Sequence, residues 1–126
     1  MREIKVLIAD DHSDFRKVVK EFLCNLPHVS VIAEAENGHE AVKKVELHSP
    51  DLVLMDISMP QLDGLEATRI IKSNWPKIKV LIATVYDDPM FRKQALEVKA
   101  DGFILKSTLK PSLEATFAIY NNNKII

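Results

Sequence analysis

The stretch Val6-Leu7-Ile8-Ala9-Asp10-Asp11 joins four consecutive apolar residues to two carboxylates. An apolar run without polar alternation is typical of a strand that is buried on both faces, as in a parallel sheet. The apolar residues that follow recur three or four positions apart, which predicts a helix with one buried face. These residues are Phe15, Val18, Val19, Phe22, Leu23 and Leu26. Because Pro27 ends the helical pattern, the first part of the chain predicts one strand followed by one helix.

The same strand and helix pattern occurs four more times along the chain. Further strands are expected at residues 29–35, 51–55, 79–83 and 102–105. Further helices are expected at residues 38–48, 65–74, 88–98 and 111–120. Alternation of this kind favours a parallel sheet with helices on both faces and right-handed crossovers. The sequence therefore predicts an α/β fold with a doubly wound, parallel, five-stranded sheet.

The composition fits one globular domain, because 47% of the 126 residues are hydrophobic and 28% are charged. The 17 basic and 18 acidic residues give a net charge of -1, which argues against a stand-alone DNA-binding module. The single cysteine, Cys24, excludes an intrachain disulfide and a cysteine-rich zinc site. No apolar run is long enough to cross a bilayer. We expect a soluble, cytoplasmic protein without a membrane partner.

Polar side chains of particular types follow four of the five expected strands. Asp10 and Asp11 follow the first strand, Asp56 the third, Thr84 the fourth and Lys106 the fifth. In open α/β sheets, ligands bind at the carboxyl ends of the strands. We therefore expect three carboxylates, one hydroxyl and one amine at the same edge of the sheet.

This set of groups suits phosphoryl chemistry. Three neighbouring carboxylates repel one another unless a cation lies between them, and their oxygens suit Mg²⁺ or Mn²⁺. Lysine supplies a second positive charge, and a hydroxyl can bond a phosphoryl oxygen. A carboxylate can itself accept the phosphoryl group, and Asp56 is the natural acceptor because Asp10 and Asp11 form a metal-holding pair.

Simpler roles are open for most of these residues. Asp10 and Asp11 could cap the helix that follows them, since Asp favours that position. Thr84 could merely end a strand, and Lys106 could be a solvated surface lysine. His12 has no second histidine near it in the pattern, so a surface residue is expected there.

The motifs at these strand ends closely resemble the receiver domain of two-component response regulators, most of all the NarL/LuxR type. The resemblance covers about residues 5–120. It rests on Asp10-Asp11-His12, Leu54-Met55-Asp56-Ile57-Ser58-Met59-Pro60, Leu62-Asp63-Gly64, Ala83-Thr84 and Ala100-Asp101-Gly102-Phe103-Ile104-Leu105-Lys106. The family implies a flavodoxin-like (βα)5 sheet in the order 2-1-3-4-5.

The resemblance also implies a role for each site residue. Asp56 would accept a phosphoryl group from a sensor histidine kinase, and Lys106 would pair with the phosphoryl oxygens. Mg²⁺ would be held by Asp11, Asp56 and the backbone carbonyl of Ser58, with Asp10 acting through water. Thr84 would move to bond the phosphoryl group.

Two further features follow from the same resemblance. Phe103 stands where the family has its switch aromatic, but it lacks the hydroxyl of the more common tyrosine, so plain core packing is an alternative. Ser58 and Tyr86 stand two residues after Asp56 and Thr84, where we expect them to tune dephosphorylation.

The domain organisation implied by the family is a receiver domain over residues 1–120, with residues 121–126 as a tail or the start of a linker. NarL/LuxR-type regulators carry a helix-turn-helix domain after the receiver, and residues 121–126 are too few to form one. We expect the chain to be an excised receiver rather than a stand-alone one. DNA would be reached only through a helix-turn-helix domain that this chain lacks, and phosphorylation could promote a homodimer.

Three other functions are weaker matches to the sequence. A phosphatase of the haloacid-dehalogenase type would carry its nucleophile after the first strand and need a cap or a longer chain. A pseudo-receiver would lack one of the site residues. A flavin or nucleotide binder would need a phosphate-binding loop where Asp10 and Asp11 stand. The sequence therefore favours a phosphorylation-controlled switch for transcription, which is not an enzyme beyond its own phosphoryl transfer and dephosphorylation.

Overall fold

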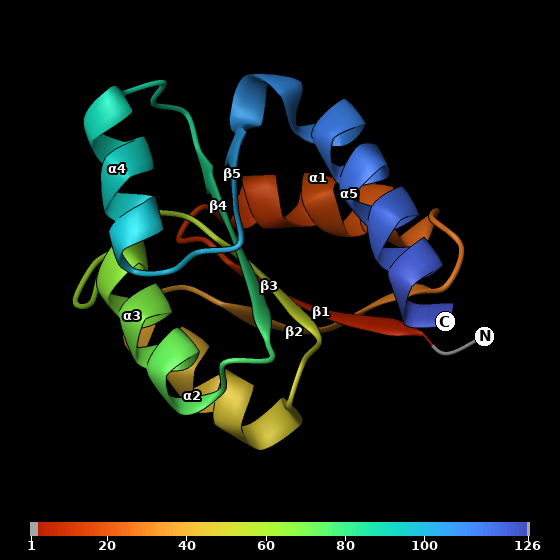
Figure 1. Cartoon of the computed structure of the whole chain (residues 1–126), viewed down its shortest axis with the longest axis horizontal. Helices are drawn as coiled ribbons and strands as arrows, with labels where there is room; N and C mark the ends of the chain where they lie inside the picture. Colours follow the sequence, from red (N-terminus) through yellow and green to blue (C-terminus); the bar gives the residue numbers. More distant parts are fainter. Residues whose placement is uncertain (1–2, 126) are drawn as a thin grey trace.

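The computed structural model describes residues 3–125 of the chain (Figure 1). The strands are β1 (Ile4–Ala9), β2 (Val29–Ala35), β3 (Leu52–Met55), β4 (Lys79–Thr84) and β5 (Gly102–Leu105). The helices are α1 (Ser13–Cys24), α2 (Gly38–His48), α3 (Gly64–Asn74), α4 (Pro89–Glu97) and α5 (Leu109–Ile125), with one 3₁₀ turn, η1 (Lys106–Thr108). None of the helices in this part of the chain is long and apolar enough to span a lipid bilayer.

The five strands form one parallel sheet in the order β2-β1-β3-β4-β5. This confirms the predicted doubly wound architecture. The register brings the strand ends together, because Ala9 lies opposite Met55 and Thr84 lies opposite Leu105. The residues that follow these positions therefore gather at one edge of the sheet.

Side chains from the two faces of the sheet build two separate hydrophobic cores. Val6 and Ile8 of β1 point into a core that α1 and α5 cover, whereas Leu7 and Ala9 point into a core that α2, α3 and α4 cover (Figure 1). All four residues are essentially inaccessible to water. Burial of both faces explains why the strands read as continuous apolar runs.

The first helix is shorter than its apolar spacing predicts. It ends at Cys24 rather than near Leu26, and the side-chain amide of Asn25 donates to the carbonyl of Glu21 at 3.1 Å. Val18, which the spacing placed on the buried face, is half exposed at 51%. The buried face of α1 consists instead of Val19 and Leu23, with Phe15, Phe22 and Leu26 partly buried beside them.

The last helix is longer than expected at both ends. It begins at Leu109 rather than residue 111, and its backbone continues to Ile125, past the predicted end at residue 120. Pro111 is the third residue of the helix, where a backbone N–H has no partner within the helix, so the missing proton costs little. Residues 121–125, which were expected to form a tail or a linker, belong to the last turns of α5.

Gly64, the first residue of α3, lies against the backbone that carries Asp56. Its N–H donates to the carbonyl of Ile57 at 2.9 Å. A Cβ at this position would overlap the backbone oxygen of Asp56 and lie 2.7 Å from its carbonyl carbon. The absence of a side chain therefore lets the start of α3 close over the end of β3.

The close approach at Gly64 predicts that Gly64→Ala destabilises the fold. The backbone of Asp56 cannot rotate away as a side chain could, so we expect a loss of about 2–3 kcal/mol, at the upper end of typical overpacking. Gly102→Ala is the matched control, because its Cβ would meet only the end of the Leu81 side chain at 2.8 Å. Urea unfolding of both variants measures the difference. Equal losses for the two variants would contradict the role of the Asp56 backbone.

Candidate phosphorylation site

Three carboxylates meet at the edge formed by the ends of β1 and β3. Asp10 and Asp11 follow β1, and Asp56 follows β3. The N–H of Asp56 donates to the carbonyl of Ala9 at 2.9 Å, which continues the pairing of the two strands beyond their ends. One oxygen from each of these carboxylates and one nitrogen of His12 lie within 4.8 Å of one another. The expected cluster of carboxylates is thus present.

The cluster is nearly closed to water at its base and open at one side. Asp10 and Asp56 are 1% and 6% exposed. The side chain of Asp11 is 32% exposed. Asp11 therefore forms the open rim of a site whose other two carboxylates are buried.

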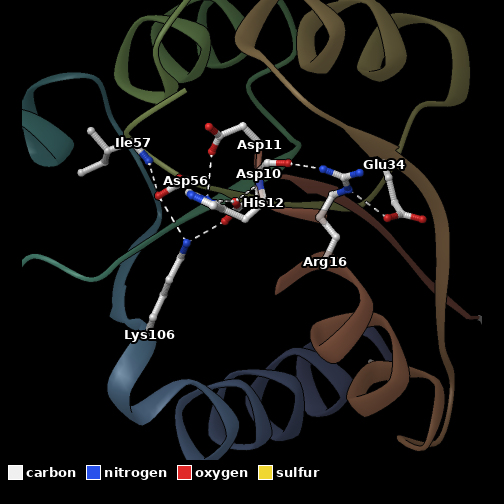
Figure 2. Close-up of polar contacts among 8 residues, drawn as sticks. All are labelled: Asp10, Asp11, His12, Arg16, Glu34, Asp56, Ile57 and Lys106. Carbon is white, nitrogen blue, oxygen red and sulfur yellow. Dashed lines mark hydrogen bonds and ion pairs between the residues drawn. The ribbon is translucent and has the colours of Figure 1, made fainter. Parts of the chain in front are cut away.

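Lys106 supplies the cation of the site (Figure 2). Its Nζ lies 2.7 Å from Oδ2 of Asp10 and 3.6 Å from Oδ1 of Asp56. It also lies 4.0 Å from the centre of the Phe15 ring. Because the lysine side chain is only 12% exposed, it is not the solvated surface lysine that was open as an alternative.

Asp56 has an environment that favours its protonated form. Burial, and then repulsion from Asp10, raise its pKa from 3.8 to about 6. Lys106 acts in the opposite direction, as does the Ile57 N–H, which donates to Oδ1 of Asp56 at 3.0 Å. The single ammonium therefore does not fully compensate the buried negative charge.

These residues fit a hard divalent cation. The donors are carboxylate oxygens from adjacent strand ends, which is the ligand chemistry that Mg²⁺ and Mn²⁺ prefer. Negative charge is in excess here, because the carboxylates of Asp10, Asp11 and Asp56 are matched by the single ammonium of Lys106. A cation held between Asp10, Asp11 and Asp56 would reduce that excess.

Thr84 and its neighbours lie beside this cluster in the sheet order. Thr84 is 1% exposed at the end of β4, and its hydroxyl accepts a hydrogen bond from the N–H of Tyr86 at 3.2 Å. Tyr86 is 52% exposed, and its ring lies 5.8 Å from that of Phe91. Ser58 is exposed in the loop after β3. The strand ends thus bring Thr84 to the site edge, with Tyr86 and Ser58 at the surface.

Phe103 lies in β5, partly buried against the core that α2, α3 and α4 cover. The guanidinium of Arg92 lies 4.5 Å from the centre of its ring and is also 3.3 Å from Oδ1 of Asp87. Arg92 thereby links the ring in β5 to the loop between β4 and α4. The sequence pattern did not indicate this contact, because the two residues are eleven positions apart on different elements.

Two other residues at the site were not recognised from the sequence. His12 is exposed, as expected, but its Nδ1 lies 3.1 Å from a carboxylate oxygen of both Asp10 and Asp11. It is also the N-cap residue of α1, so neither Asp10 nor Asp11 has that position. Arg16 donates to the backbone carbonyl of Asp10 at 2.6 Å (Figure 2). The one sequence feature that could have indicated Arg16 is its position in the first turns of α1, close to Asp10 and Asp11 along the chain.

The sequence matches the response regulator receiver domain family over residues 6–118. Among its curated relatives is the transcriptional regulatory protein DegU of Brevibacillus brevis, which is 41% identical over 104 residues, 82% of this chain and 44% of DegU. Another is the transcriptional regulatory protein LnrK of Bacillus subtilis, which is 36% identical over 124 residues, 98% of this chain and 56% of LnrK. The chain thus spans about half the length of the curated relatives it matches.

Solved structures have the same fold. The signal receiver domain of NarL from Mycobacterium tuberculosis is 31% identical, with a TM-score of 0.87 over 98% of both chains. A LuxR-family DNA-binding response regulator from Staphylococcus aureus is 28% identical, with a TM-score of 0.87 over 94% of this chain and 98% of that one. The carboxylate edge, the strand order and these similarities agree, and the chain belongs to the response regulator receiver domain family.

Proposed function

We propose that this receiver domain is a switch that accepts a phosphoryl group on Asp56 from a sensor histidine kinase. The observation that carries the proposal is the buried carboxylate of Asp56, which lies within 4.8 Å of the carboxylates of Asp10 and Asp11 and 3.6 Å from the ammonium of Lys106. The complete set of acidic, basic and hydroxyl groups at the sheet edge favours an active receiver over a pseudo-receiver that serves only for protein contact.

In the proposed reaction, an oxygen of Asp56 attacks the phosphorus of a phosphohistidine. The bond between phosphorus and the imidazole nitrogen breaks, and the imidazole leaves with the electron pair. Asp11, Asp56 and the backbone carbonyl of Ser58 would hold Mg²⁺ or Mn²⁺, with Asp10 acting through water. The cation supplies positive charge that offsets the charge on the phosphoryl oxygens.

Lys106 is placed to pair with a phosphoryl oxygen on Asp56, because its Nζ is already 3.6 Å from a carboxylate oxygen of that residue. We assign the conformational response to phosphorylation to Thr84 and Phe103. Thr84 would exchange its bond from the Tyr86 N–H for one to the phosphoryl group. Phe103, held under Arg92, would then repack beside β4.

Hydrolysis of the acyl phosphate regenerates the Asp56 carboxylate and releases phosphate. Ser58 and Tyr86 are exposed, and they follow the site residues Asp56 and Thr84 by two positions each. We assign to them the rate of dephosphorylation. The chain then catalyses only its own phosphoryl transfer and hydrolysis and turns over no other substrate.

The names of the relatives suggest which process this receiver controls. DegU and LnrK are transcriptional regulatory proteins, and this chain matches only about half of each. We propose that the receiver over residues 1–120 acts in the cytoplasm, and that it controls transcription through a separate helix-turn-helix domain. Phosphorylation would change the face of α4, β5 and α5 and promote a homodimer.

The first prediction from the proposed function concerns the acceptor. Wild-type protein incubated with acetyl phosphate and Mg²⁺ should gain one phosphoryl group, because the buried carboxylate of Asp56 lies among the acidic residues and 3.6 Å from the ammonium of Lys106. Asp56→Asn should gain none, and neither should wild type without a divalent cation. Intact-mass spectrometry measures each. Asp14→Asn, which removes an exposed carboxylate from α1, is the control and should behave as wild type. Equal uptake by Asp56→Asn would show that the acceptor is wrong.

The second prediction separates acceptance from response. Thr84→Ala removes the hydroxyl but leaves the carboxylates and Lys106 in place, so it should accept the phosphoryl group within about threefold of the wild-type rate. It should, however, lose the phosphorylation-dependent changes in the amide NMR signals of β5 and α4. Thr108→Ala, which removes an exposed hydroxyl from η1, should keep them. A full response in Thr84→Ala would contradict its assigned role.

The third prediction follows from the raised pKa of Asp56. Its pKa is about 6 in the folded chain and 3.8 without the protein environment, so the folded state binds more protons between these values. Stability conferred by the protonated carboxyl is present below about pH 4 and is lost as the pH rises to about 6. At 1.4 kcal/mol per pKa unit, the loss is roughly 3 kcal/mol.

Asp56→Asn should therefore exceed wild type in unfolding free energy by up to about 3 kcal/mol at pH 7, with no excess near pH 4. Urea unfolding without divalent cations at several pH values measures this gap. Mg²⁺ should narrow it, because a ligand of the folded state stabilises wild type alone. Asp14→Asn should show no comparable pH dependence. A gap that is the same at pH 4 and pH 7 would show that charge on Asp56 is not its cause.

A further inference from the structure

Arg16 lies beside the carboxylate cluster, and its hydrogen bonds go to the backbone of Asp10 and to the side chain of Glu34 (Figure 2). Its Nη1 donates to the backbone carbonyl of Asp10 at 2.6 Å. Its Nε donates to Oε1 of Glu34 at 3.1 Å. The guanidinium is largely buried, with 13% of its side chain exposed. It is thus held in one orientation between a carbonyl and a carboxylate.

These contacts tie together three elements of the fold. Arg16 is on α1, Asp10 joins β1 to α1, and Glu34 is on β2 opposite Ile8 of β1. A guanidinium is planar and donates in fixed directions, so one arginine can bond two acceptors only if they keep a set geometry. The three elements are therefore fixed relative to one another at the place where the carboxylates emerge.

The carbonyl of Asp10 belongs to the peptide plane that runs from the Cα of Asp10 to the Cα of Asp11. Holding this carbonyl therefore constrains the positions from which both carboxylates leave the chain. Other polar groups of Asp10 are bonded as well. Its N–H donates to the carbonyl of Ala35 at 2.9 Å, and its Oδ2 accepts from Nζ of Lys106 at 2.7 Å. Asp10 is 1% exposed, so water would not readily replace Arg16 at the carbonyl.

We propose that Arg16 is a positioning residue for divalent-cation binding, which acts by fixing the peptide between Asp10 and Asp11. Glu34 takes part by holding the guanidinium. The inference rests on the proposed function, because it concerns the same carboxylate site. It adds residues from α1 and β2 that do not contact the cation.

The direction in which Mg²⁺ affinity changes when Arg16 is removed distinguishes a positioning role from a purely electrostatic one. If Arg16 acted only as a nearby positive charge, it would repel Mg²⁺, and its removal would tighten binding. If it positions the two carboxylates, its removal loosens the ligand geometry and weakens binding. Mutation of a residue that orients a metal ligand typically lowers the affinity for the metal by about 10- to 100-fold.

The experiment is a calorimetric Mg²⁺ titration of the full chain at one pH and ionic strength. Arg16→Ala should bind Mg²⁺ about tenfold more weakly than wild type. Lys20→Ala is the matched control, since it removes the same charge from the same helix and a contact to Glu34 at 3.5 Å, but does not touch Asp10. It should stay within about twofold of wild type. Asp11→Ala should lose most of the binding.

Two conservative variants and one truncation test how Arg16 acts. Arg16→Lys keeps the charge but cannot bond both acceptors with one fixed fork, so its affinity should lie between those of wild type and Arg16→Ala. Glu34→Gln keeps an oxygen that accepts from Nε and should stay within about threefold of wild type. Glu34→Ala releases the guanidinium and should bind Mg²⁺ several-fold more weakly.

A second readout separates positioning from general damage to the fold. The rate of phosphorylation by acetyl phosphate is measured against Mg²⁺ concentration. In Arg16→Ala the half-saturating Mg²⁺ concentration should rise, while the rate at saturation stays near that of wild type. A lowered plateau without a shift in half-saturation would indicate a structural role only and would overturn the proposal.

Equal or tighter Mg²⁺ binding by Arg16→Ala would also overturn it. If Arg16→Ala does not fold cooperatively, Arg16→Lys and Glu34→Ala decide, and wild-type affinity in both would refute the inference. Failure of the proposed function would show in a different experiment, as wild-type protein that gains no phosphoryl group on Asp56. Failure of the positioning role alone leaves wild-type phosphorylation intact.

Discussion

The ion pair between Lys106 and Asp10 is the interaction on which the site depends. It joins the end of β5 to the end of β1, although the two residues are 96 positions apart in sequence. Within residues 3–125, no lysine or arginine side chain other than Lys106 pairs with the nearly buried carboxylates of Asp10 and Asp56. The pair therefore fixes the lysine where it also reaches Asp56, at 3.6 Å.

The ammonium of Lys106 offsets only part of the unfavourable effect of burying the Asp56 carboxylate beside Asp10. Asp56 keeps a pKa of about 6, because burial and the charge of Asp10 outweigh the help from Lys106. The folded chain is thus under electrostatic stress at neutral pH. A divalent cation held by these carboxylates would relieve that stress. An acyl phosphate on Asp56 would carry more negative charge than the carboxylate, so the proposed phosphorylation would need both that cation and Lys106.

In the proposed function, the sheet would carry a change at Asp56 to other elements. Thr84 ends β4, and Phe103 lies in the adjacent β5, so both have fixed places in the same sheet. Arg92 lies over the Phe103 ring and pairs with Asp87 in the loop before α4. On the opposite side, Arg16 connects the acidic residues to β2 through Glu34. The site is therefore bordered by one contact network toward α4 and another toward α1.

The sequence by itself determined the class of fold, the strand order through its family resemblance, and the groups that emerge at the strand ends. It could do so because burial on both faces produces continuous apolar runs, and because parallel strands place their ends at one edge. Only the tertiary structure decided the lengths of α1 and α5, the bonds of Arg16 and the stacking of Arg92 on Phe103. Helix ends depend on capping contacts, and long side chains choose partners by distance in space. Neither of these leaves a periodic pattern along the chain.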